Sequence, residues 1–294
     1  GMRADGQGSP ALRLVRTLLD IGIWLLVGFG AFLVVWGIWF RCILRERPPV
    51  STLYETVIFI TACSVLVCFV MEAINRRRIA LALTPVLGAL GLMLASRYEV
   101  IKAEDTMPQL QAVLDTNYWL TLHVLTVTFG YAAGLIAAAV AHVYVFGKVF
   151  GVKDDGFFRV VSKMIYGMIC FTLLLSTVGT ILGGVWANDS WGRFWGWDPK
   201  ENGALMIVLW NVIILHARMG GFIKPFGIAM ASIFGGLVVA ASWWGVNLLG
   251  IGLHSYGFTE GIATGLAIFA GFELIVLGLG AVWYFFLRQR PRGA

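Results

Sequence analysis

Apolar segments long enough to cross a bilayer recur along the whole chain and restrict it to one class of fold. The 294 residues are 59% hydrophobic and only 13% charged, which is more apolar surface than a soluble domain of this length can bury. Apolar runs of this length are typical of transmembrane helices. We predict an all-α polytopic membrane protein with eight spans, at residues 19–40, 53–74, 79–96, 118–147, 160–184, 203–217, 226–247 and 263–287.

The basic residues between the spans predict which face is cytoplasmic. Of the 22 Lys and Arg residues, 15 lie on the side that holds both termini and seven lie on the opposite side. Cytoplasmic loops carry the excess of basic residues, so both termini are predicted to be cytoplasmic. This placement accounts for the net charge of +6 without a nucleic-acid partner. Residues 1–18 are then a flexible cytoplasmic leader, 19–287 the membrane domain and 288–294 a cytoplasmic tail.

The stretch WANDSWGRFWGWDPKEN, residues 186–202, is predicted to be an external loop after the fifth span. It places Trp186, Trp191, Trp195 and Trp197 within twelve positions. An interfacial indole belt explains scattered tryptophans, but it does not require this density in one loop. Each indole has a large apolar surface, so we expect a flat apolar ligand to lie against them. Trp191 and Trp195 are four residues apart, so on a helical turn they would share one face.

The end of this stretch is typical of a helix start. Asp198, Pro199 and Glu201 fit the N-cap, the first position and the third position of a capping box. Both carboxylates thus have a sufficient structural role, and neither is predicted to be a catalytic acid. Arg193 and Lys200 could meet anionic groups of a ligand, although solvated loop charges explain them equally well.

Two of the four histidines are predicted to lie on the external side, one before and one after this stretch. His123 is about 8 Å inside the outer end of span four, and His254 is in the loop between spans seven and eight. Either one alone could be an ordinary hydrogen-bonded residue. Together, beside an indole-rich surface, they predict a bis-histidine haem site, because imidazole is a usual axial ligand.

The other two histidines are predicted to lie deeper in the membrane. His216 is roughly 20 Å from the outer end of span six, where an ionisable residue is functional by default, although snorkelling to the interface is the simpler explanation. His142 is assigned to the cytoplasmic interface, and it is the only candidate in the chain to share a metal with His216. The four cysteines include no C-x-x-C pair, so neither a thiol relay nor a disulfide scaffold is predicted.

These residues also carry a family resemblance. WGRFWGWDPKE resembles the WGxxWxWD signature of the haem-handling membrane proteins that share a WWD domain. The segments RPPVSTLYETVIF, LDTNYWLTLHV, WDPKENGALMIVLWNVIILHAR and GVNLLGIGLHSYG narrow the resemblance to the CcsA (ResC) family, the membrane subunit of the system II cytochrome c synthase. The resemblance covers nearly the whole chain after the leader.

The resemblance implies a function and a set of site residues. The function is haem transport to the outer face and attachment of that haem to the CxxCH motif of apocytochrome c, a lyase-type reaction. His123 and His254 would be the external iron ligands and the catalytic residues, and His216 would ligate haem b on its way out. The haem surface would include Trp186, Trp191, Arg193, Trp195, Trp197 and Asp198.

The same resemblance implies partners and a location. A CcsB (ResB)-like membrane subunit would supply the second ligand of the His216 haem. Thioredoxin-like proteins would keep the apocytochrome thiols reduced. The protein would contact lipid in the bacterial cytoplasmic membrane with its active face outside, in preference to a thylakoid membrane.

Three other functions remain open from the sequence. A CcmC-type haem-delivery subunit shares the tryptophan signature but usually has fewer spans. A bis-histidine cytochrome b would need facing histidines inside the bilayer, and the estimated depths of His142 and His216 differ by roughly 16 Å. A solute transporter explains the eight spans but not the tryptophans.

The charge distribution generates a topological prediction. A reporter fused after Arg78, or within 150–157, should respond as cytoplasmic, whereas one within 186–200 or 250–258 should respond as external. Alkaline phosphatase and green fluorescent protein fusions measure the two states in parallel. A cytoplasmic response from 186–200 would contradict the assigned orientation.

Overall fold

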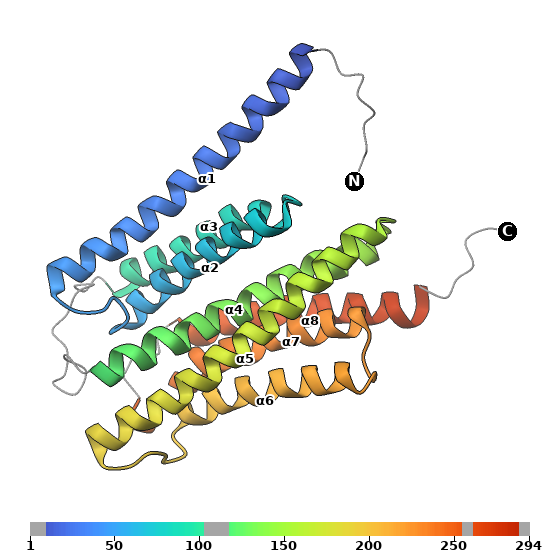
Figure 1. Ribbon diagram of the computed structural model, residues 1–294. Helices are drawn as coiled ribbons and strands as arrows, with labels where there is room; N and C mark the ends of the chain where they lie inside the picture. Colours follow the sequence, from blue (N-terminus) through green and yellow to red (C-terminus); the bar gives the residue numbers. More distant parts are fainter. Residues whose placement is uncertain (1–9, 103–117, 255–260, 288–294) are drawn as a thin grey trace. The chain divides into compact units, whose positions relative to one another are not determined.

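The computed structural model describes residues 10–102, 118–254 and 261–287, and in these ranges the chain is helical with no strand (Figure 1). The helices are α1 (Pro10–Arg45), α2 (Leu53–Asn75), α3 (Ile79–Lys102), α4 (Tyr118–Val149), α5 (Asp155–Trp191), α6 (Pro199–Met219), α7 (Pro225–Trp243), the 3-10 turn η2 (Gly245–Leu249), α8 (Ile262–Val282) and the π-helical turn η3 (Trp283–Leu287). Eight helices in the described ranges are long and apolar enough to cross a membrane. The all-α class and the eight predicted spans are confirmed.

Helices α1 and α5 extend furthest beyond their predicted spans. Helix α1 begins at Pro10, inside the segment predicted to be a leader. Helix α5 begins after the N-cap Asp154, whose side chain accepts the Phe157 N–H at 2.9 Å, and it continues to Trp191. It ends there because Gly192 adopts the left-handed conformation of a C-cap, with φ 70°. The first part of the tryptophan stretch is therefore helical, and its assignment as a loop was wrong for residues 186–191.

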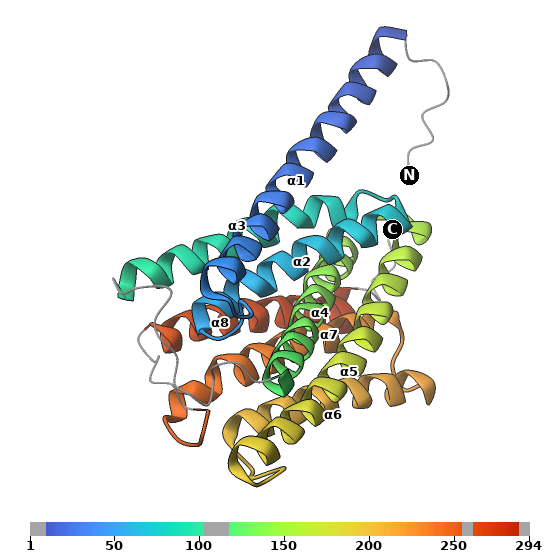
Figure 2. The same cartoon turned by 60° about the vertical axis from the view of Figure 1, so that its left-hand side comes forward.

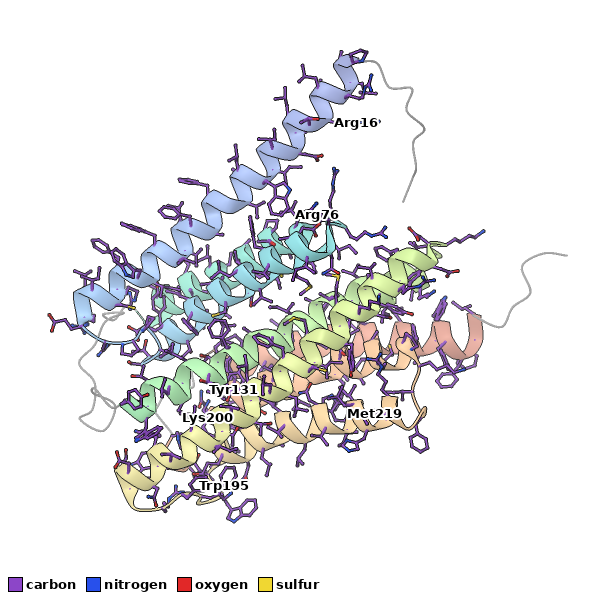
Figure 3. The ribbon with its side chains drawn as sticks, in the orientation of Figure 1. Arg16, Arg76, Tyr131, Trp195, Lys200 and Met219 are labelled. Atoms are coloured by element: carbon purple, nitrogen blue, oxygen red, sulfur yellow. The ribbon has the colours of Figure 1, made fainter. Side chains whose placement is uncertain are left out.

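The N-terminal unit, residues 1–109, contains α1, α2 and α3. Its α2–α3 turn is held by the buried carboxylate of Glu72, which accepts the backbone N–H groups of Arg78 and Leu81. Arg16 and Arg76, both predicted to be cytoplasmic, lie at the same end of this unit (Figure 3).

The C-terminal unit, residues 110–294, is a bundle of the remaining five long helices. Helix α4 packs against α5 along its length, and α7 packs against α4, α6 and α8 (Figures 1 and 2). Successive helices run in opposite directions. The start of α4, the end of α5, the start of α6 and the end of α7 therefore meet at one end of the unit, called the site end below.

Small residues let α4 and α5 approach closely. A Cβ atom added at Gly130 would lie 2.6 Å from Ser176 Oγ, and one added at Gly179 would lie 2.7 Å from the backbone nitrogen of Val127. In lipid no hydrophobic effect drives helices together. Their association therefore relies on close packing of this kind. This close contact between the two helices brings the backbone of α5 within reach of side chains on α4.

His142 has a partner inside the bundle that the sequence did not predict. Its Nε2 atom lies 3.0 Å from Oε2 of Glu273 on α8, and Glu273 is only 2% exposed. Its Nδ1 atom lies 2.8 Å from the Ala138 carbonyl oxygen, and its ring stacks on Phe272. Each ring nitrogen thus has an oxygen beside it, and the contact with Glu273 joins α4 to α8 inside the bundle.

The His142–Glu273 pair should stabilise the bundle. Removing either partner by substitution with leucine leaves the other buried without its contact, which costs roughly 1–3 kcal/mol of unfolding free energy. Replacing both with leucine should cost less than the sum of the single changes, with a coupling of roughly 1 kcal/mol. Unfolding in detergent titrated with sodium dodecyl sulfate measures all four proteins. Additive single changes would show that the pair does not act as a unit.

Candidate functional site

Two tryptophans and two predicted ligands gather at the site end of the C-terminal unit. Trp186 is 1% exposed and lies at the centre. Its ring stacks on His123 with centroids 6.2 Å apart and planes 10° apart, and its centroid lies 5.9 Å from that of His254. Trp191 meets Trp186 at 4.6 Å and His254 at 5.4 Å, in both cases edge to face. The structure thus brings together two histidines that are far apart in the sequence.

His123 is held by the backbone of the neighbouring helix. Its Nδ1 atom lies 2.7 Å from the Gly179 carbonyl oxygen. A carbonyl oxygen can only accept, so Nδ1 carries the proton and Nε2 keeps its lone pair. A Cβ at Gly183 would lie 2.6 Å from His123 Cε1, so the glycine makes room for the ring.

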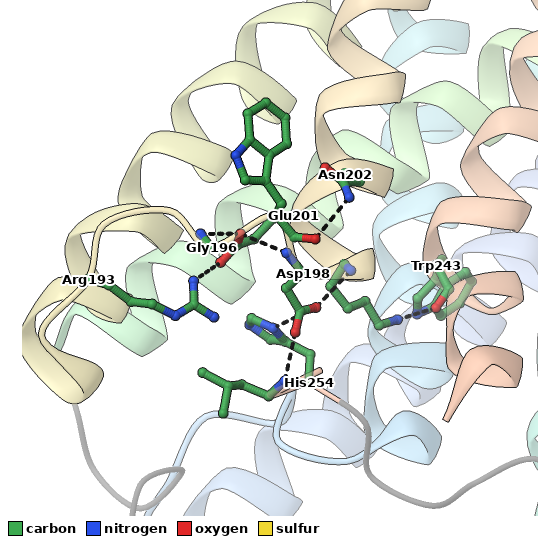
Figure 4. Close-up of polar contacts among 10 residues, drawn as sticks. Arg193, Gly196, Asp198, Glu201, Asn202, Trp243 and His254 are labelled. Carbon is green, nitrogen blue, oxygen red and sulfur yellow. Dashed lines mark hydrogen bonds and ion pairs between the residues drawn. The ribbon is translucent and has the colours of Figure 1, made fainter. Parts of the chain in front are cut away.

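His254 is held by a carboxylate from the start of α6. Its Nδ1 atom lies 3.2 Å from Asp198 Oδ1, and the adjacent Leu253 N–H donates to Asp198 Oδ2 at 2.6 Å (Figure 4). Gly252 has φ +91°, and a Cβ there would lie 2.1 Å from Asp198 Oδ2. Only glycine allows this backbone conformation and this approach together.

The capping box predicted for α6 is confirmed. Asp198 Oδ1 accepts the Lys200 N–H at 2.9 Å, and Glu201 Oε2 accepts the Asp198 N–H at 3.0 Å. Burial opposes ionisation of Asp198, but the His254 ring and the N–H groups of Lys200 and Leu253 outweigh it and lower the pKa of Asp198 to about 2. The carboxylate therefore stays charged at neutral pH.

Trp195 and Trp197 do not join the central aromatic group. They follow the end of α5, so Trp195 and Trp191 do not share a helical face as the spacing suggested. Trp195 meets Trp197 edge to face at 5.8 Å. Trp197 is 69% exposed and has φ 56°, a left-handed conformation that is rare for a bulky residue. The two tryptophans form a second, more exposed aromatic pair.

The two cations of the stretch already have protein partners. Arg193 makes an ion pair of 2.9 Å with Glu201, and Lys200 donates to the Trp243 carbonyl oxygen at the end of α7 (Figure 4). Both contacts tie the stretch to the helix ends around it.

His216 lies toward the opposite end of the C-terminal unit. Figure 3 shows Trp195 and Lys200 at the site end and Met219, three residues after His216, at the other. His216 is exposed, about 25 Å along α6 from Pro199, and its Nδ1 faces the Val212 carbonyl oxygen at 2.9 Å. Because His142 is engaged by Glu273, the two inner histidines do not form a pair in the structure.

A haem held by His123 and His254, as the family resemblance implies, would be bound here as a substrate. His123 Nδ1 lies 2.7 Å from the Gly179 carbonyl oxygen and His254 Nδ1 lies 3.2 Å from Asp198 Oδ1, so Nε2 would be the nitrogen of each ring that faces an iron atom. The buried Nε1–H of Trp186 has no acceptor among the described residues. The described residues contain no group of three or more His, Cys, Asp or Glu side chains suited to a bare metal ion. A porphyrin iron needs only two protein ligands.

Sequence reasoning missed three parts of this arrangement. The charge of Glu273 inside an apolar run was a usable signal, because ionisable residues in spans need partners. The Gly179 carbonyl could be found only by placing α5 against α4. The contact of Asp198 with His254 joins two residues on separate segments of the chain, and neither residue indicates the other in a single sequence.

The fold and the site define a class: a polytopic helical membrane protein whose tryptophan-rich end holds two histidines. Residues 50–254 match the family model described as cytochrome C assembly protein. The chain belongs to this family, as the tryptophan signature and the histidine spacing indicated.

The curated relatives carry the name cytochrome c biogenesis protein CcsA. The relative from Synechococcus sp. (strain CC9902) is 31% identical over 85% of this chain and 95% of its own length. The Chlamydomonas reinhardtii relative is 31% identical over 83% and 71%. The relative from Trachelium caeruleum is 29% identical over 76% and 82%.

The close approach at Gly252 generates a test of the loop geometry. Gly252→Ala should displace the 250–254 loop from Asp198, because its Cβ would overlap the carboxylate. Gly250→Ala is the matched control: Gly250 also has a positive φ, of +61°, but an added Cβ would meet nothing within 4 Å. Hydrogen exchange at Leu253 should rise much more in Gly252→Ala. Equal exchange in the two variants would mean that the carboxylate does not hold this loop.

Proposed function

We propose that the chain delivers haem to the outer face of the membrane and takes part in its covalent attachment to apocytochrome c. Membership of the cytochrome c assembly family and similarity to CcsA proteins support a role in cytochrome c biogenesis. The observation that carries the finer proposal is the gathering of His123 and His254 around Trp186, with both Nδ1 atoms engaged.

His123 and His254 would hold the haem iron through their Nε2 atoms. Trp186 and Trp191 provide apolar surface beside the two rings. The exposed pair Trp195 and Trp197 offers further indole surface at the same end of the unit. Two ligands and this surface would fix the orientation of the haem, and positioning of reactants is a large part of catalysis.

The attachment would proceed by addition of thiols to alkenes. The histidine of the CxxCH motif replaces one protein ligand on the iron. Each cysteine sulfur then bonds to one vinyl group, and the thiol hydrogen ends on the other vinyl carbon, so no oxidant is consumed. The thiols must be reduced beforehand. All four cysteines of this chain are free, and the sequence has no C-x-x-C pair, which supports thioredoxin-like partners as the source of reduction.

His216 would ligate haem on its way across the membrane, together with a ligand from a CcsB-like partner. Its exposed ring on α6 supports this proposal, because an incoming subunit can reach it. His142 cannot supply the second ligand while both its nitrogens are engaged. The same fact disfavours a bis-histidine cytochrome b with His142 and His216 as ligands.

We place the protein in a bacterial cytoplasmic membrane with the site end outside. The charge distribution supports the orientation, and the eight apolar helices support a multi-pass protein. A thylakoid membrane is the alternative location, because the relatives include cyanobacterial and chloroplast proteins.

Ligand replacement tests the outer site. His123→Ala or His254→Ala removes a nitrogen donor but leaves the indoles in place, so each variant should lose cytochrome c attachment and regain part of it with added imidazole. Trp191→Ala should lose attachment without rescue, because imidazole cannot replace an apolar contact surface. Haem-stained cytochrome c from cells that depend on the variant measures the outcome. Equal rescue of both classes would show that the histidines are not iron ligands.

A further inference from the structure

The carboxylate of Asp198 makes three contacts that converge from two separate segments. It accepts the N–H of Lys200 in its own helix and the N–H of Leu253 in the 250–254 loop, and it faces Nδ1 of His254. The residue is 5% exposed. Both carboxylate oxygens of Asp198 thus contact neighbours within the chain. Asp198 would therefore influence a bound haem through His254.

The surrounding residues are arranged for this contact. Gly252 has no side chain, which lets the loop backbone lie against the carboxylate of Asp198. Trp191 lies edge to face with the His254 ring and limits its tilt. The other acidic residue of the capping box, Glu201, instead binds Arg193 and the N–H groups of Gly196 and Asp198. Two carboxylates of one helix start therefore have different partners.

The two candidate ligands differ in what their Nδ1 atoms face. His123 faces a neutral carbonyl, that of Gly179, at 2.7 Å. His254 faces a carboxylate at 3.2 Å. A carboxylate that accepts from a ligating imidazole fixes its tautomer and raises its basicity, and hydrogen bonding around axial ligands is one of the ways in which a protein sets a haem potential.

We propose that Asp198 is the positioning residue of His254: its carboxylate holds the Nδ1–H tautomer, aims Nε2 at the iron, and makes His254 a stronger electron donor than His123. The iron-directed part rests on the proposed haem site. The proposed hydrogen bond from His254 Nδ1 to Asp198 Oδ1, 3.2 Å away, does not, so the two can be tested separately. A role limited to helix capping makes a different prediction, because asparagine caps helices about as well as aspartate.

The first experiment measures the hydrogen bond without haem. The chain has four histidines, so the full-length protein labelled with 15N-histidine gives few ring signals, and His254→Gln identifies those of His254. We expect the Nδ1–H tautomer for His254, with its proton signal far downfield. Nε2–H as the major tautomer would overturn the proposal. The unaltered protein gives this result, so it does not depend on the folding of a variant.

The second experiment measures the effect on iron in the haem-loaded full chain. Asp198→Asn should retain haem in a low-spin form but shift its midpoint potential upward, because a neutral amide no longer polarises the imidazole. Glu201→Gln is the matched control, with a carboxylate lost from the same capping box and no contact to His254; its potential should stay at the unaltered value. An unchanged potential in Asp198→Asn, or an equal shift in both variants, would overturn the electronic role.

The two experiments separate the possible failures. If the unaltered protein shows the Nδ1–H tautomer but His254→Ala leaves haem binding and spectrum unchanged, the hydrogen bond stands and the proposed haem site is wrong. If haem binding requires His254 but Asp198→Asn leaves the midpoint potential of the haem unchanged, the haem site stands and the positioning role is wrong. Asp198→Ala, which removes both cap and acceptor, should lower haem affinity by about 10–100-fold.

Discussion

A polar side chain in a membrane-spanning protein is stabilised by partners within the protein, and in all four histidines of the chain a protein oxygen lies beside Nδ1. Nδ1 faces a backbone carbonyl in three of them: Gly179 for His123, Ala138 for His142 and Val212 for His216. In the fourth, His254, it faces a carboxylate. With Nδ1 engaged, only Nε2 is left for chemistry. His142 loses that atom too, to Glu273. The three remaining histidines are those that the family resemblance implies as ligands.

The partner of His123 depends on how closely two helices pack. A side chain on α4 reaches a carbonyl of α5 only because glycines at 179 and 183 leave room for the backbone and for the ring. The last turns of α5 then carry Trp186 and Trp191 into the same region. The contact between α4 and α5 therefore accounts both for the close packing of small residues and for the aromatic group at the site end. A larger residue at either glycine would separate the helices or displace the imidazole.

The sequence predicted the parts that depend on local patterns. Apolar length gave the eight spans, and the order of Asp198, Pro199 and Glu201 gave the start of α6. The end of α5 was placed too early, because the polar residues after 184 resemble a loop although the helix ends only at Gly192. The contacts of His142 and His254 could not be predicted, since their partners lie on elements whose positions depend on tertiary packing. Sequence spacing predicted candidate ligands but not the groups that contact them.

The start of α6 also determines the backbone conformation of Trp197. Trp197 has a left-handed backbone, which costs a bulky residue roughly 1–2 kcal/mol. Asn202 donates to its carbonyl oxygen at 3.0 Å, while Glu201 accepts the N–H groups on both sides of it. These contacts hold the strained conformation, in which the Trp197 side chain is 69% exposed. Because Asp198 follows directly, the same turn that exposes Trp197 directs the next carboxylate inward to His254. Strain at one residue and orientation at the next are thus set together by one helix start.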